Sequence, residues 1–228
     1  MSFVYFIRHA QASANAADYD QLSPLGFAQA HSIHQHFQQT DHTIDHIWVG
    51  PRKRHRQTYE TARCKDWPKA EYKSWLDEFP AHDIMEKGIE TLEGEMWSAD
   101  IKSVRSSVGT GSESFLRILQ HLCDLWITDA LILEEVERGS EYLERIQNGL
   151  KELMKILSKG ESVMIFSSAG LIGSTVGASI GADPKQSLRN AWAIYNGSLH
   201  ILRNFQGQYM MAGFNWIDHI PSSKRTFV

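Results

Sequence analysis

The chain has 228 residues, of which 42% are hydrophobic and 22% are charged. This is the composition of an ordinary globular protein, and it excludes wholesale disorder. The net charge of −4 leaves no broad basic face for nucleic acid or anionic lipid, so any bound anion needs a local positive cluster. The two cysteines, Cys64 and Cys123, lie far apart in the sequence, which argues against a disulfide framework.

The apolar run at the N-terminus is interrupted at Arg8 and His9, which is too early for a signal peptide. No stretch approaches the roughly 18 apolar residues that a membrane helix needs. We therefore expect a cytoplasmic protein with neither a membrane nor a nucleic acid as partner. Since domains average roughly 150 residues, we also expect one domain over residues 1–228, with a lid and helical insert at about residues 79–157.

Buried strands and helices are predicted to alternate along the chain. Residues 3–7 form a short apolar run that is typical of a buried strand, and residues 46–49 form a second. Between them, Ser23 followed by Pro24 marks the start of a helix that reaches about residue 37. A polar helix follows the second strand. Residues 162–166 predict a third buried strand, directly followed by another helix.

The remaining segments complete the predicted fold. Residues 79–112 are poorly periodic, and residues 114–157 form a long helical stretch with an interruption near Gly139. Residues 198–202 and 208–212 predict a late pair of strands joined by a turn. The alternation indicates a mostly parallel central sheet with helices on both faces, a three-layer α/β/α sandwich. In such sheets, binding sites gather at the carboxyl ends of the strands.

Polar residues follow the first strand directly. Arg8 offers a planar, permanently charged group for phosphate oxygens, and His9 beside it can serve as base, metal ligand or nucleophile. The pair alone is not diagnostic, but Asn15 and the sequence Leu-Ser-Pro-Leu-Gly-Phe-Ala-Gln-Ala at residues 22–30 extend it. This longer pattern resembles the histidine phosphatase superfamily, which includes the cofactor-dependent phosphoglycerate mutases.

The resemblance implies a phosphoglycerate mutase-like fold and a role for each matching residue. His9 is implied as the nucleophile that forms a phosphohistidine, and Arg8 as a ligand of the phosphoryl oxygens, assisted by Asn15. Ala10 stands where the family usually has glycine, which adds a methyl group to the pocket. No metal or other cofactor is expected, because the helical histidines near His31 have no carboxylate or cysteine arranged around them.

The second strand is followed by the strongest positive cluster of the chain, Gly-Pro-Arg-Lys-Arg-His-Arg-Gln-Thr at residues 50–58. This segment is similar to the family pattern Ser-Pro-x-x-Arg-x-x-Gln-Thr, with Gly50 in place of the serine. The similarity implies that Arg54 is the second phosphate-binding arginine. The neighbouring basic side chains are expected to face solvent or the pocket rim, and His55 is expected on the helix surface without a catalytic role.

An acid is needed to protonate the oxygen that leaves when a phosphoryl group moves to histidine. The sequence Trp-Leu-Asp-Glu-Phe at residues 75–79 resembles the Leu-x-Glu segment of the family, which implies Glu78 as that acid. Asp77 competes by its chemistry, and only the spacing to Leu76 favours Glu78. The family's usual continuation, Gly-x-x-Glu-Gly, is absent from this chain.

The family pattern breaks after the third strand. A second histidine is usual there, in a Ser-His-Gly-Gly segment, whereas this chain reads Ser-Ser-Ala-Gly and places Ser168 at the histidine position. Serine donates a hydrogen bond to a phosphoryl group but carries no charge, and losing one donor typically costs about 10²–10³ in rate. The segment resembles a branch of the family that has serine here. We hypothesise that His82, four residues beyond Glu78, moves into the vacant position and contacts the substrate with Ser168.

Taken as a set, these residues predict a metal-independent phosphomonoester hydrolase of the histidine acid phosphatase type, with a phosphohistidine on His9 and an activity that Ser168 reduces. A phosphoglycerate mutase is an alternative, which the acidic residues of segment 79–112 disfavour. A non-catalytic phospho-ligand binder is another, motivated by Ser168. The sequence does not choose between a phosphorylated small molecule and a phosphoprotein as substrate, and it leaves open a homodimer.

Overall fold

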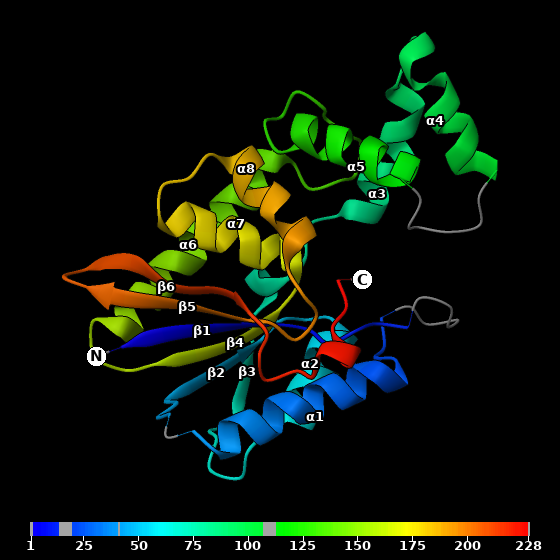
Figure 1. Ribbon diagram of the computed structural model, residues 1–228. Helices are drawn as coiled ribbons and strands as arrows, with labels where there is room; N and C mark the ends of the chain where they lie inside the picture. The colour runs from blue at the N-terminus through cyan, green and yellow to red at the C-terminus, as the bar shows by residue number, and fades with distance from the viewer. Residues whose placement is uncertain (1, 14–19, 41, 107–112, 228) are drawn as a thin grey trace. The chain divides into compact units, whose positions relative to one another are not determined.

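The computed structural model describes residues 2–13, 20–40, 42–106 and 113–227 (Figure 1). The chain divides into two compact units, one formed by Met1–Glu78 with Ile146–Val228 and the other by Phe79–Arg145. The single domain expected from the length stays a prediction.

The first unit is built on a six-stranded sheet whose order is β3-β2-β4-β1-β5-β6 in the described part of the chain. Strands β1, β2, β3 and β4 are mutually parallel, β5 runs antiparallel to β1, and β6 runs antiparallel to β5. The predicted mostly parallel sheet is therefore confirmed. The strands are β1 (Phe3–Arg8), β2 (His46–Val49), β3 (Ala70–Tyr72), β4 (Val163–Ser167), β5 (Leu199–Phe205) and β6 (Gln208–Trp216).

Helices cover both faces of this sheet and make the three-layer α/β/α sandwich (Figure 1). Helices α1 (Pro24–Gln38) and α2 (Lys53–Ala62) lie on one face, and α7 (Ala169–Ser179) with the later part of α6 (Gly139–Leu157) lies on the other. Helix α1 starts as predicted, because the Ser23 side chain accepts the Gly26 N–H at 2.9 Å. Shorter helices are α8 (Pro184–Arg189) and the 3₁₀ turns η1 (Ser74–Leu76), η3 (Asn190–Ala193) and η4 (Ser222–Lys224).

The core on the α1 and α2 side joins apolar side chains from three parallel strands. Ile7, Ile47 and Phe166 come from β1, β2 and β4, and they pack with Ile33 of α1 and Tyr59 of α2. Burying large side chains of this kind stabilises the fold by roughly 1.5–3 kcal/mol each. The three strands are thereby held side by side, so that their carboxyl ends meet at one edge.

The second unit is helical. Its elements are α3 (Ala81–Gly88), η2 (Ile89–Thr91), α4 (Glu95–Ser106), α5 (Glu113–Trp126) and the first part of α6. Its core includes Phe79, Trp126 and Tyr142, whose rings lie 5.3–6.4 Å apart between centroids. The described part of the poorly periodic segment, residues 79–106, forms α3, η2 and α4. One expectation is corrected: the break before α6 spans residues 127–138 instead of lying only near Gly139.

Candidate active site

The carboxyl ends of β1, β2 and β4 bring the predicted polar segments together, as the sequence led us to expect. In the sheet register, Arg8 pairs with Ser167 and Val49 pairs with Phe166. The His9 N–H continues the ladder by donating to the Ser167 carbonyl at 2.8 Å. The residues after each of the three strands therefore share one edge of the sheet.

His9 is held as a buried, neutral imidazole. Its side chain is buried, with 7% of the residue exposed, and its Nδ1 lies 2.8 Å from the Ala10 carbonyl oxygen. Since a carbonyl only accepts hydrogen bonds, Nδ1 carries the hydrogen and Nε2 keeps its lone pair. Burial lowers the pKa of His9 well below its usual value, and the positive charges of Arg54 and Arg8 act in the same direction. A neutral imidazole with a free Nε2 is the form that attacks phosphorus.

Two arginines flank His9, and both already bind acceptors of the protein. Arg8 donates through Nη1 to the carbonyl oxygens of Ile194 and Phe227. Arg54 is buried and donates through Nη1 to an Asp20 carboxylate oxygen at 2.7 Å. The other Asp20 oxygen accepts the Lys53 N–H, also at 2.7 Å, at the start of α2.

Sequence reasoning missed Asp20. Its carboxylate accepts hydrogen bonds from a guanidinium and from an N–H at a helix N-terminus. Donors of these two kinds commonly hold phosphate in proteins. Any anion that binds Arg54 Nη1 or the Lys53 N–H competes with this carboxylate. The signal available in the sequence was an acidic residue shortly before the α1 cap, which is too common to be recognised.

Ser168 is the N-cap residue directly before α7, and its side chain is fully buried. Its Oγ is 3.3 Å from Arg54 Nη2 and 2.6 Å from His55 Nε2. The His55 ring is also fully buried, and its centroid is 5.7 Å from that of His9. The expectation that His55 lies on the helix surface is wrong. It belongs to the buried side of α2, together with Thr58 and Tyr59.

Glu78 reaches the same edge of the sheet from the loop after η1. Its Oε2 accepts the Gly170 N–H at 3.2 Å and its Oε1 accepts the Leu171 N–H at 3.1 Å, so the carboxylate caps the first turn of α7. Asp77 is paired with the Arg52 guanidinium instead. Glu78, and not Asp77, therefore contacts the start of α7, and its role as the acid stays a prediction.

Two predicted residues are not placed in this group. Asn15 lies outside the described residues. His82 belongs to the second unit, on α3, where its side chain is exposed and its Nε2 is 3.6 Å from a Glu86 oxygen. The position beside Ser168 that the hypothesis assigned to His82 is occupied by His55. A contact of His82 with substrate stays a prediction.

A metal site is not indicated among the described residues. Ligand atoms of His82, Asp83 and Glu86 lie within 4.8 Å of one another, but the group is largely exposed, and such clusters are common without an ion. His31 and His34 stack with centroids 5.7 Å apart, and His34 Nδ1 binds the Arg63 carbonyl at 3.0 Å. No carboxylate completes a ligand set there.

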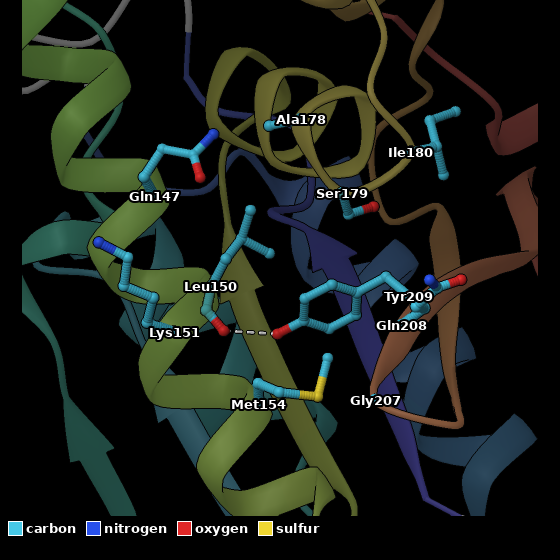
Figure 2. Close-up of a pocket in the computed structure, with 10 residues that line it drawn as sticks. All are labelled: Gln147, Leu150, Lys151, Met154, Ala178, Ser179, Ile180, Gly207, Gln208 and Tyr209. Atoms are coloured by element: carbon cyan, nitrogen blue, oxygen red, sulfur yellow. Dashed lines mark hydrogen bonds between the residues drawn. The ribbon is translucent and has the colours of Figure 1, made fainter.

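A separate pocket lies at the other end of α7, near Ala178 and Ser179 (Figure 2). It has a volume of about 480 Å³ and is lined by α6, the end of α7 and the β5–β6 turn. Tyr209 crosses it to donate to the Leu150 carbonyl at 2.6 Å. Its charged lining residue is Lys151, so it lacks the arginines and histidines that the strand ends provide.

The family model of the histidine phosphatase superfamily (branch 1) matches residues 4–217 of this chain. The chain belongs to that superfamily. The family supports phosphatase or phosphoryl-transfer activity for this chain. No curated protein matches the chain in sequence, and no described helix has the length and apolarity needed to cross a membrane.

Solved structures of histidine phosphatase-like proteins share the fold. The phosphoserine phosphatase of Entamoeba histolytica, solved with 3-phosphoglyceric acid, has a TM-score of 0.65 and 15% identity over 97% of this chain and 100% of that one. The α-ribazole phosphatase of Shigella flexneri scores 0.63 at 16% identity over 93% and 96%. The mycobacterial glucosyl-3-phosphoglycerate phosphatase scores 0.62 at 17% identity over 95% and 100%.

Proposed function

We propose that the protein is a metal-independent phosphomonoester hydrolase that works through a phosphohistidine on His9. The observation that carries the proposal is the state of the His9 ring, whose Nδ1–H is held by the Ala10 carbonyl and whose Nε2 is left as a nucleophile between two arginines. An imidazole kept neutral beside permanent positive charge is suited to attack an anionic phosphoryl group.

In the first half of the proposed reaction, Arg8 and Arg54 hold the phosphoryl oxygens. The His9 Nε2–P bond forms as the bond between phosphorus and the leaving oxygen breaks. That oxygen takes a proton from Glu78, which must first be protonated and turn one oxygen away from the start of α7. Phosphoryl oxygens can then take the N–H groups that Glu78 now caps.

In the second half, water attacks the phosphohistidine and gives one proton to Glu78. The P–N bond breaks, phosphate leaves, and the neutral ring of His9 is restored. Glu78 thus acts first as acid and then as base, so that atoms and protons balance over one turnover.

The substrate is proposed to be a small phosphomonoester or a phosphoprotein. A phospho-ligand binder without turnover is the second candidate, because Ser168 carries no charge at the position where the family pattern has histidine. A phosphoglycerate mutase is disfavoured by the acidic residues of segment 79–112. The cytoplasmic location, the absence of nucleic-acid and membrane partners, and a homodimer stay predictions.

A phosphatase screen tests the proposal, with sugar phosphates, nucleotides, phosphopeptides and a generic aryl phosphate as substrates. Wild type is expected to hydrolyse at least the aryl phosphate, and His9→Ala is expected to lose that activity because the substitution removes the Nε2 that attacks phosphorus. His31→Ala, at an exposed histidine of α1, is the matched control and should keep full activity. Activity that survives in His9→Ala contradicts the mechanism.

A further inference from the structure

We propose that Ser168 and His55 are positioning residues for Arg54, and that together they hold its guanidinium in the orientation that binds a phosphoryl group. The inference rests on one part of the proposed function, the binding of a phosphoryl oxygen by Arg54. The three residues are buried and come from adjoining elements. Arg54 and His55 belong to the first turn of α2, and Ser168 is the N-cap residue before α7.

The His55 ring sets the direction of the hydrogen bonds. Its Nδ1 lies toward Gly50, since a Cβ on Gly50 would be 2.3 Å from that atom. The Gly50 backbone is the hydrogen-bond partner of the ring on this side, and a carbonyl only accepts, so Nδ1 carries the hydrogen. Burial lowers the pKa of His55 well below its usual value, and the charges of Arg54 and Arg52 lower it further. The ring is therefore neutral, and its Nε2 is an acceptor.

Ser168 connects this ring to Arg54. Its Oγ lies 2.6 Å from His55 Nε2, and because that nitrogen accepts, the hydroxyl hydrogen points to the ring. The lone pairs of Oγ are left for Arg54, whose Nη2 donates to it at 3.3 Å. A guanidinium has no acceptor, so the direction of this bond is fixed. Since each hydrogen bond in such a chain polarises the next, His55 strengthens the acceptor that Ser168 offers to Arg54.

The Arg54 guanidinium is thereby held at both Nη atoms. Nη1 donates to Asp20 at 2.7 Å and Nη2 donates to Ser168, while the buried Nε has no hydrogen-bond partner in the described part of the chain. A planar group held at two points keeps its remaining donor in one direction. The charge of Arg54 lies near enough to His9 to lower the pKa of that ring. A phosphoryl oxygen next to His9 is therefore a suitable acceptor for the unpaired donor.

Two departures from the family pattern provide the space that His55 occupies. At position 50 the pattern has serine, whose Cβ would lie 2.3 Å from His55 Nδ1 and 2.8 Å from the Leu76 carbonyl oxygen. Glycine leaves that space to the ring. At position 168 the pattern has histidine, and the shorter serine leaves the imidazole of His55 within 2.6 Å of Oγ. Both departures are thus what the hydrogen-bond chain to Arg54 requires.

Calorimetric titration with inorganic phosphate tests this role and does not depend on turnover. Ser168→Ala removes the acceptor of Arg54 Nη2 and should raise the dissociation constant about 10-fold. His55→Leu fills the space but leaves the hydroxyl hydrogen without an acceptor, and it should raise the constant by about the same factor. His55→Gln keeps an acceptor in its Oε1 and should stay within about 3-fold of wild type.

A double-mutant cycle with Arg54→Lys separates positioning from a general effect on the fold. Lysine keeps the charge but has no Nη2, so phosphate should bind about 10-fold more weakly. Adding Ser168→Ala to Arg54→Lys should then change the dissociation constant by less than about 2-fold, because the two changes remove the same bond. His31→Ala, at an exposed histidine of α1, is the control and should bind phosphate as wild type does.

The inference is overturned if Ser168→Ala weakens binding equally with and without Arg54→Lys, or if a folded His55→Leu protein binds phosphate as tightly as wild type. Phosphate binding that Arg54→Lys leaves unchanged also overturns it, because the anion then lies elsewhere. If His55→Leu does not fold, as circular dichroism would show, the cycle with Ser168→Ala still decides. Turnover that survives in His9→Ala contradicts the proposed hydrolase mechanism but leaves the phosphate titrations as a separate test.

Discussion

At the scale of single residues, the Asp20 carboxylate holds donors that a phosphoryl group would use. Its two oxygens accept from Arg54 Nη1 and from the Lys53 N–H at 2.7 Å each. If the proposed function holds, the phosphoryl group of the substrate competes with this partly buried ion pair. The pair gives Nη1 of the buried guanidinium an acceptor, at a cost in affinity for a phosphoryl group that binds there.

Asp20→Asn should therefore bind inorganic phosphate more tightly, because the amide keeps the shape of the side chain but no longer neutralises Arg54. We expect an inhibition constant lower by about 10-fold, the equivalent of roughly 1.4 kcal/mol. Competition of phosphate against the aryl substrate measures it. Asp218→Asn, which breaks the more exposed Arg225 pair at 3.2 Å, is the matched control and should leave the constant unchanged. Equal or weaker phosphate inhibition in Asp20→Asn would contradict this reading of the pair.

At the scale of elements, the ends of the three strands could be predicted from the sequence, but the side of α2 that is buried could not. Strands β1, β2 and β4 are short apolar runs, so their positions, and with them His9, Arg54 and Ser168, followed from the sequence. Helix α2 reads Lys-Arg-His-Arg-Gln-Thr-Tyr-Glu-Thr-Ala, and hydropathy does not reveal which of these polar side chains are buried.

His55 shows why the side of α2 could not be read from composition. Its side chain is buried because Ser168 and Gly50 leave room for it, and those two residues lie far apart in the sequence. The i, i+4 spacing of His55 and Tyr59 was the local hint. Strand β3 was not predicted, for a different reason. Its three residues are half-buried or exposed, so they show no apolar pattern in the sequence.

At the scale of the whole molecule, buried neutral histidines link stability to pH. His200 is fully buried in β5, where its Nδ1 accepts the Asn215 N–H at 3.2 Å and its Nε2 lies 3.0 Å from Ser198 Oγ. Burial lowers the pKa of His200 to about 3, and it lowers that of His219 to about 4. These rings take up protons more readily in the unfolded chain than in the folded one.

The folded protein should therefore lose stability as the pH falls below about 6.5, because protons then bind preferentially to the unfolded state. The contribution of His200 is present in full above that pH and is lost progressively as the pH falls toward about 3. Between pH 7 and about pH 4.5, this histidine alone should cost roughly 2–3 kcal/mol of unfolding free energy.

Urea unfolding at several pH values measures this dependence. His200→Gln, which cannot be protonated, should show a shallower fall in unfolding free energy toward acid pH than wild type. The exposed His31→Gln variant is the control and should keep the wild-type slope. Identical slopes for wild type and His200→Gln would show that the buried His200 ring is not the cause of the pH dependence of the unfolding free energy.

The central claim is that His9 carries the phosphoryl group during turnover, and direct detection of phosphohistidine tests it. Wild-type protein is mixed with a ³²P-labelled aryl or acyl phosphate, the reaction is quenched under conditions that preserve phosphohistidine, and the label is located by peptide mapping. We predict label on His9 in wild type and none in His9→Ala, with His31→Ala labelled as wild type. A wild-type protein that binds phosphate analogues but never carries label on His9, from any donor, would contradict the account and favour a phospho-ligand binder.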